Sequence, residues 1–264
     1  MIQRTLFLIL LFNVLLHAYQ DNDVDGVDDR IDRCLNTSFD DIVDESGCPH
    51  NMNKQTKLIL EIGTELAYDQ EDTKTNAFNF YLSYQYANWF ATLSNSSYNI
   101  SDSSYDDLSL GGDYYAMLGY IHRVNILSIQ YALGVKIPNQ NSDISSGEFD
   151  YFGFVTLNYP ISTKQSLYAS YGYTIKNDSN TQTYNNYHSL ALGGQYQIND
   201  KWQVGLGYKY NGASYEEGDD YRTLSLNGCY KLSKNFYVKA NYEKGLNDQA
   251  YKNAFSLSIG VTFE

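Results

Sequence analysis

Apolar and polar residues alternate along most of the chain after residue 56. Between residues 127 and 137 the odd positions are all apolar or aromatic, whereas the even positions include Ser128, Gln130 and Lys136. Side chains of a β-strand point alternately to opposite faces of a sheet, so this pattern predicts strands rather than helices. Twelve such segments are expected, and their ranges are 57–68, 76–87, 89–98, 108–121, 125–137, 148–159, 166–176, 186–198, 202–210, 221–232, 236–243 and 253–263.

The connections between these segments alternate in length. Short ones are expected at 88, 122–124, 160–165, 199–201 and 233–235. Long polar ones are expected at 69–75, 99–107, 138–147, 177–185, 211–220 and 244–252. Short turns at one end and long loops at the other are typical of an antiparallel up-and-down transmembrane β-barrel. We therefore predict an all-β barrel of about 12 strands, and an even number places both of its ends on the short-turn, periplasmic side.

Aromatic residues mark the strand ends on the apolar face. The chain contains 27 tyrosines, and a ring with a polar tip suits a boundary between hydrocarbon and water. Two aromatic girdles are therefore expected. The girdle beside the short turns comprises Tyr86, Trp89, Tyr120, Tyr159, Tyr196, Trp202, Tyr230, Phe236 and Phe263, and that toward the long loops comprises Tyr68, Phe78, Tyr151, Tyr173, Tyr210, Tyr242 and Phe255. A water-soluble β-sandwich, the alternative, would bury its apolar face as a core.

The C-terminus resembles the signal by which bacterial barrels reach their assembly machinery. Its alternating hydrophobic residues end in Phe263, with Glu264 as a one-residue departure. From residue 57 onward the chain resembles bacterial outer-membrane barrels in general, without a specific porin family. This resemblance implies an outer-membrane location, with membrane lipid and the barrel assembly machinery as partners.

The first residues predict a secretory signal peptide. Arg4 precedes an apolar run that ends at Leu16, and the small residue Ala18 follows. The run is about 11 residues long, which is too short to span a bilayer. The expected organisation is a signal peptide at 1–18, an acidic segment at 19–50, a linker at 51–56 and the barrel at 57–264.

The acidic segment predicts a calcium site. The net charge is −13, yet ten acids and two arginines lie within residues 20–48. Positions 1, 3, 5, 9 and 12 of a calcium loop correspond to Asp21, Asp23, Asp25, Asp29 and Asp32. Gly26 stands at the sixth position, where the loop bends sharply, and the Val27 carbonyl at the seventh. The alternative is a solvated acidic linker. No basic patch indicates a nucleic-acid partner.

Residues 21–49 resemble the thrombospondin type 3 repeat, in the bacterial form found beside outer-membrane barrels and peptidoglycan-binding domains. The shared features are the DxDxDGVxDxxDxC core, the Asn36–Thr37 pair and the closing VDESGCP. In that family the acidic positions bind calcium and the two cysteines pair. The resemblance implies calcium ligation by Asp21, Asp23, Asp25, Val27, Asp29 and Asp32, and a Cys34–Cys48 disulfide. Leu35 departs from the proline usual in the family.

Few of the remaining residues suggest a reactive or catalytic role. Cys229 lies in an expected strand, where it is predicted to be a small buried hydrophobe. An outer-membrane phospholipase presents His and Ser together on its lipid-facing wall, but neither His122 nor His188 has a serine two residues away, and His50 lies in the linker. We therefore expect no enzymatic activity, with a barrel hydrolase as a further alternative.

Charged residues on the polar face of the strands are expected to point into the lumen. They are Glu61, Glu65, Asp113, Lys136, Lys176, Lys209, Lys239 and Glu243. Three of them, Lys136, Lys176 and Lys209, fall near the outer mouth, where a positive ring would favour anions. Pairing with Glu65 and Glu243, which would plug the lumen, is slightly favoured over a ring.

The predicted function is that of an outer-membrane barrel, a narrow porin-like channel carrying a periplasmic calcium-binding segment. A closed structural or adhesive barrel, whose polar loops meet periplasmic or cell-surface partners, is the alternative. Strand number does not decide between them, since about 12 strands fall between a filled barrel of eight and an open pore of 16.

Overall fold

The structure is a computed structural model, and it describes residues 56–101, 108–139, 147–178, 183–215 and 218–263, together with Asp23, Val27, Asp29, Asp32–Cys34, Thr37, Val43 and Ser46–Cys48. The predicted signal peptide and most of the predicted linker lie outside these residues. The larger of two compact units comprises Lys54–His122 and Ser128–Glu264. None of the described residues forms a helix with the length and hydropathy needed to cross a membrane.

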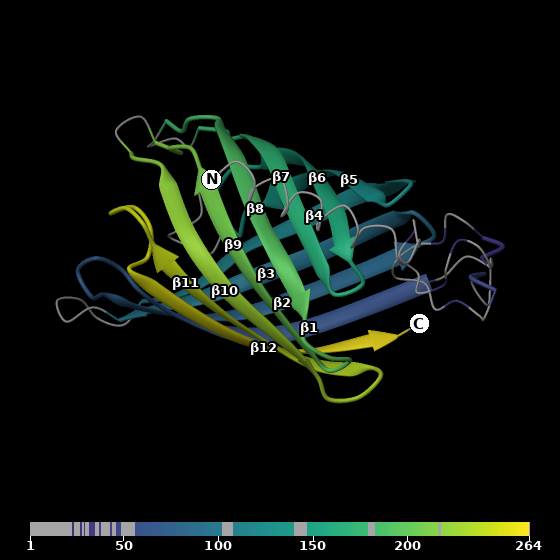
Figure 1. The fold of residues 1–264 in the computed structure, drawn as a ribbon. Helices are drawn as coiled ribbons and strands as arrows, with labels where there is room; N and C mark the ends of the chain where they lie inside the picture. The colour runs from purple at the N-terminus through teal and green to yellow at the C-terminus, as the bar shows by residue number, and fades with distance from the viewer. Residues whose placement is uncertain are drawn as a thin grey trace, which may run out of the picture. The chain divides into compact units, whose positions relative to one another are not determined.

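The larger unit is a closed antiparallel barrel of 12 strands, which confirms the predicted fold (Figure 1). Each strand pairs with its neighbours in sequence, and β1 pairs with β12 to close the barrel. The strands are β1 (Thr56–Tyr68), β2 (Lys74–Tyr86), β3 (Trp89–Ser101), β4 (Leu108–Val124), β5 (Leu127–Ile137), β6 (Asp150–Ser162), β7 (Gln165–Ile175), β8 (Tyr187–Gln197), β9 (Trp202–Asn211), β10 (Tyr221–Lys231), β11 (Phe236–Gly245) and β12 (Asn253–Phe263).

Two of the predicted short connections have other bounds in the structure. The turn expected at 122–124 is wrong, because β4 continues through Val124 and the chain reverses at 125–126. Asn125 takes a φ of 52°, and Ala87 takes a φ of 50° in the equally tight β2–β3 turn. A positive φ is what a two-residue hairpin turn requires, and asparagine tolerates it better than most residues. The second difference is at 160–165, where β6 and β7 extend into the expected turn.

The pairing of β3 with β4 contains one irregularity. The register between β3 and β4 shifts between Asn95 and Ser97, as at a β-bulge. The amide Nδ2 of Asn95 donates hydrogen bonds to the carbonyls of Gly112 and Asp113 at 2.8 and 3.2 Å. The extra residue lies on β4, where Gly112 and Asp113 together stand opposite Ser96, whereas β3 pairs with β2 in one continuous register.

The barrel is apolar outside and polar inside. Leu133, Leu206 and Leu118 on the outward face are 75%, 66% and 56% exposed. The buried apolar residues, among those described, are five alanines, whereas Lys136, Asp150 and Thr223 are also buried. A water-soluble protein would bury its leucines, so this distribution suits a lipid surround.

Aromatic rings gather at both ends of the outward face. Near the short turns, Trp89 packs edge-on against Tyr120 with ring centroids 5.0 Å apart, and Trp202 lies 4.6 Å from Tyr230. Toward the long loops, Phe78, Tyr151 and Phe255 are exposed on the same face. The expected girdles are therefore in place.

Glycines on the inner wall make room for aromatic rings. A Cβ on Gly134 would lie 2.2 Å from Cζ of Phe152, and a Cβ on Gly119 would lie 2.2 Å from Cζ of Phe90. The same holds for Gly260 beneath Tyr237. These rings lie against the barrel wall because the residue beneath each has no side chain.

We predict that Gly134→Val destabilises the barrel by about 1–3 kcal/mol, because Phe152 must leave its place against the wall. The measurement is the urea midpoint of the refolded barrel. Gly228→Val is the matched control, since the nearest atom to a Cβ there is 4.0 Å away. Equal midpoints for the two variants would contradict the prediction.

Candidate functional site

The inner wall of the barrel is the candidate site. The strand registers place Glu61, Glu65, Lys209, Lys239 and Glu243 on one face, opposite small or polar residues of the neighbouring strands. The polar residues of this wall are mainly amides and hydroxyls, and they include Gln195, Gln203, Ser225, Asn227, Asn241, Ser256 and Ser258.

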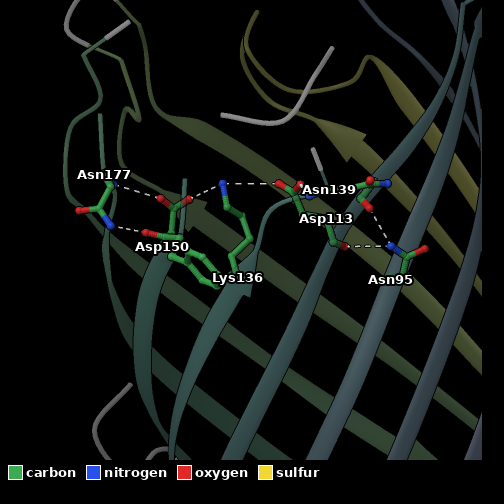
Figure 2. A network of polar contacts seen from close by, with 8 residues as sticks. Asn95, Asp113, Lys136, Asn139, Asp150 and Asn177 are labelled. Carbon is green, nitrogen blue, oxygen red and sulfur yellow. Dashed lines mark hydrogen bonds and ion pairs between the residues drawn. The ribbon is translucent and has the colours of Figure 1, made fainter. Parts of the chain in front are cut away.

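A buried ion triad lies near the long-loop end of β4, β5 and β6 (Figure 2). Nζ of Lys136 is 2.7 Å from Oδ2 of Asp150 and 3.5 Å from Oδ2 of Asp113. The three side chains are between 4% and 12% exposed. One ammonium lies between two carboxylates, and its short contact with Asp150 and longer contact with Asp113 join three adjacent strands.

The triad also holds the first residues of two long loops (Figure 2). The backbone N–H of Asn139, just after β5, donates to Oδ1 of Asp113 at 2.9 Å. The backbone N–H of Asn177, just after β7, donates to Oδ1 of Asp150 at 3.1 Å, and its side chain donates to the Phe149 carbonyl. Each carboxylate therefore bridges the central ammonium and a loop.

Lys176 follows β7 beside this triad. Burial lowers the pKa of its ammonium, Asp150 and Asp113 oppose that shift, and Lys136 adds to it. Its Nζ lies 4.2 Å from the centroid of the Tyr184 ring. A cation over an aromatic face is stabilised by the ring quadrupole, so the ammonium of Lys176 is held by a ring of the β7–β8 loop.

A second ion pair lies on the opposite wall. Nζ of Lys239 in β11 is 2.5 Å from Oε1 of Glu61 in β1, and the Tyr237 hydroxyl donates to the same oxygen. The Lys239 side chain is 48% exposed, against 8% for Lys136. This pair is thus more open to the lumen than the triad.

The third group of charges comprises Glu65, Glu243 and Lys209. Glu243 and Lys209 both act electrostatically on Glu65. Nζ of Lys209 lies 5.8 Å from the Tyr221 ring centroid, and Asn241 donates to Oε1 of Glu243 at 3.2 Å. The lysines at the outer mouth therefore do not form an isolated positive ring, because carboxylates stand beside each of them.

Sequence reasoning expected Glu65 and Glu243 as the partners of these lysines and missed Asp150. Asp150 forms the shortest contact of the triad and is the first residue of β6, directly opposite Lys136. It lay within the expected strand 148–159 on the same face as the polar Thr156 and Asn158. The alternation therefore placed Asp150 on the inner face, but only the register between β5 and β6 shows that it lies opposite Lys136.

The acidic segment brings together the three aspartates of the predicted calcium site that the structure describes. Carboxylate oxygens of Asp23, Asp29 and Asp32 lie within 4.8 Å of one another. Asp32 is 9% exposed, and its buried Oδ2 accepts no hydrogen bond. Such an oxygen needs a partner, and converging carboxylates suit a hard divalent cation. The predicted ligands Asp21 and Asp25 lie outside the described residues.

Hydrogen bonds and a disulfide order the rest of this segment. Cys34 and Cys48 are joined, as the repeat resemblance implies. The Thr37 N–H donates to Oδ2 of Asp23 at 2.6 Å, and the Cys34 N–H donates to Oδ1 of Asp32 at 2.7 Å. A Cβ on Gly47, whose φ is 73°, would lie 1.9 Å from Oδ1 of Asp32. Glycine is required there for both reasons.

Comparison with known proteins places the chain in a family. The model of the family described as the putative MetA pathway of phenol degradation matches residues 44–263. The chain belongs to this family. The match takes in the whole barrel and starts within the acidic segment. No curated protein matches the sequence.

Solved structures share the fold at low identity. An outer-membrane channel from Pseudomonas putida F1 aligns with a TM-score of 0.60 and 13% identity, over 84% of this chain and 100% of that one. The NanC porin and the KdgM porin each align with a TM-score of 0.56 and 13% identity, over 78% of this chain and 99% of theirs. This member of the family therefore has a porin-type barrel fold.

His188 of this family member lies among tyrosines. Nδ1 of His188 is 2.6 Å from the Tyr171 hydroxyl, and its ring lies 4.8 Å from that of Tyr173. The neighbouring Ser189 pairs with Gly172 and Asn211 on the opposite face. The described contacts of His188 are thus with tyrosines, and they do not include the serine that a Ser–His hydrolase pair needs.

Cys229 was expected to be buried, and in the structure it is only partly buried.

We predict that Lys136→Met destabilises the refolded barrel by about 3 kcal/mol, because two buried carboxylates lose the cation between them. Urea unfolding followed by tryptophan fluorescence measures the loss. Lys239→Met is the matched control, and because Lys239 is half exposed its loss should stay below about 1 kcal/mol. A loss at Lys136 no larger than that at Lys239 would contradict the prediction.

Proposed function

We propose that the chain is a narrow channel of the bacterial outer membrane, for small hydrophilic solutes. The observation that carries the proposal is a closed barrel with an exposed apolar outer face and an inner wall of amides, hydroxyls and charges. Such a wall replaces the hydration of a passing solute, whereas lipid covers the outside. The porin-type fold supports the same proposal.

The inner charges bear on selectivity. Lys136 and Lys239 are each in contact with carboxylates, so neither offers a full positive charge to the lumen. Lys209 stands near Glu65 and rests over the Tyr221 ring. We therefore expect weak rather than strong ion selectivity, and no catalytic role for the inner wall.

The refolded protein should produce discrete conductance steps in a planar lipid bilayer. Lys209→Glu should move the reversal potential toward cation preference, because it replaces a cation near Glu65 and Glu243 by a third carboxylate. Heat-modified migration on a gel confirms that each sample is folded. A folded barrel that never conducts would contradict the channel and favour the closed, adhesive alternative.

We further propose that the acidic segment binds calcium in the periplasm. Its supports are the three converging carboxylates, the buried Oδ2 of Asp32 and the repeat resemblance. The side chains of Asp23, Asp29 and Asp32 would hold the ion, which would neutralise their mutual repulsion. Both ends of the barrel lie on the short-turn side, where Leu58 pairs with Phe263, and short turns are periplasmic in such barrels.

Calcium titration of the full mature chain tests this second proposal. Asp32→Asn should weaken calcium binding at least tenfold, because it removes a charged ligand whose other oxygen is already held by the Cys34 N–H. Asp248→Asn, an exposed acid of the β11–β12 loop, is the charge-matched control. Calcium affinity that is unchanged in the Asp32 variant would contradict the site.

A further inference from the structure

Formal charges are distributed unequally between the two faces of the barrel. In the described strands, Glu61, Glu65, Asp113, Asp150 and Glu243 all face inward. The outward face of the described strands carries three charged side chains and no carboxylate, and the three are Lys74, Arg222 and Lys244. All three, called the rim cations below, are exposed.

The rim cations lie on neighbouring strands at the long-loop end. Lys244 of β11 pairs with Asn253 of β12, Asn253 pairs with Tyr68 of β1, and Tyr68 pairs with Lys74 of β2. Because adjacent strands lie about 4.8 Å apart, the two lysine backbones are separated by about 14 Å. Arg222 extends the row by one strand, since its carbonyl accepts from the N–H of Leu246, just after β11.

The row is rich in hydrogen-bond donors. Nζ of Lys244 donates to Oδ1 of Asn253 at 3.4 Å, and the Tyr242 hydroxyl donates to the same oxygen at 2.7 Å. None of the described carboxylates forms an ion pair with Lys74 or Lys244. Arg222 pairs with Asp220, yet its side chain remains 49% exposed.

We propose that the rim cations bind the phosphate groups of an anionic lipid in the outer leaflet. The proposal rests on the outer-membrane location given above, but not on channel activity. At the edge of the apolar band a lysine extends along hydrocarbon and keeps its ammonium among the head groups. A row of two ammonium groups and one guanidinium, with a tyrosine and an amide between the lysines, complements phosphate oxygens held at one height.

The opposite end of the same outward face supports this assignment. There the strand ends carry aromatic residues such as Trp89, Trp202, Phe236 and Phe263, without a lysine or arginine. Exposed cations of the short-turn end, such as Lys164 and Lys201, lie in the turns and not on the outward face of the strands. Only at the long-loop end do cations of the described strands point outward among the lipid head groups, which favours a ligand on that side of the membrane.

The test is a titration of the full mature protein, refolded in micelles, with fluorescently labelled bis-phosphorylated lipid A. Binding is followed by fluorescence anisotropy. The triple variant Lys74→Gln, Arg222→Gln, Lys244→Gln should bind about a hundredfold more weakly, at about fivefold for each cation lost. Dephosphorylated lipid A should bind the wild-type protein as weakly as the triple variant binds the phosphorylated form.

The matched control removes three exposed cations from the short-turn end by Lys164→Gln, Lys201→Gln and Lys231→Gln. It changes the net charge equally and should keep wild-type affinity. Equal losses in the two triple variants, or equal affinity for both forms of lipid A, would overturn the proposal. So would displacement by micromolar inorganic phosphate, which would indicate a free anion as the ligand. Channel conductance is measured in a separate experiment, so its absence would contradict the proposed channel and not the lipid site.

Discussion

The pairing of β1 with β12 is the constraint on which the rest of the structure depends. It runs without interruption from Leu58 opposite Phe263 to Tyr68 opposite Asn253. In hydrocarbon an unpaired backbone N–H or C=O costs several kcal/mol, because no water replaces the lost hydrogen bond. Closure therefore removes both sheet edges at once, and every other strand can then present an apolar outer face to lipid.

Closure also inverts the usual distribution of side chains. Since leucines such as Leu133 and Leu206 face outward, polar groups face inward and must find partners across the wall. The triad of Asp113, Lys136 and Asp150 is one solution, in which each carboxylate also accepts a loop N–H. A second is the placing of rings against glycines, as with Phe152 and Gly134, which fills the interior at little cost in lumen width.

The sequence predicted the barrel well because alternation is a local property of each strand. All 12 strands were expected, and their bounds differ from the structure by a few residues. The contacts of the inner wall could not be predicted, because they depend on register between strands. Lys136 and Asp150 are 14 positions apart in the sequence, and they meet only because the register of β5 and β6 sets them opposite each other. The bulge in β4 is a similar case, since the carbonyls of its Gly112 and Asp113 accept hydrogen bonds from Asn95 of β3.

The location of the carboxylates follows from their surroundings. With anionic lipid at the rim cations, as proposed, a carboxylate on the outward face would lie at the edge of hydrocarbon, near head groups of its own sign, and its side chain is too short to extend past them. Inside the barrel the same group finds an ammonium, as Glu61 finds Lys239. Lysine and arginine meet neither obstacle, because their long side chains reach the head groups and their charge is opposite. On this proposal, the inward carboxylates and the outward rim cations share one cause, the electrostatic difference between the lumen and the lipid head groups.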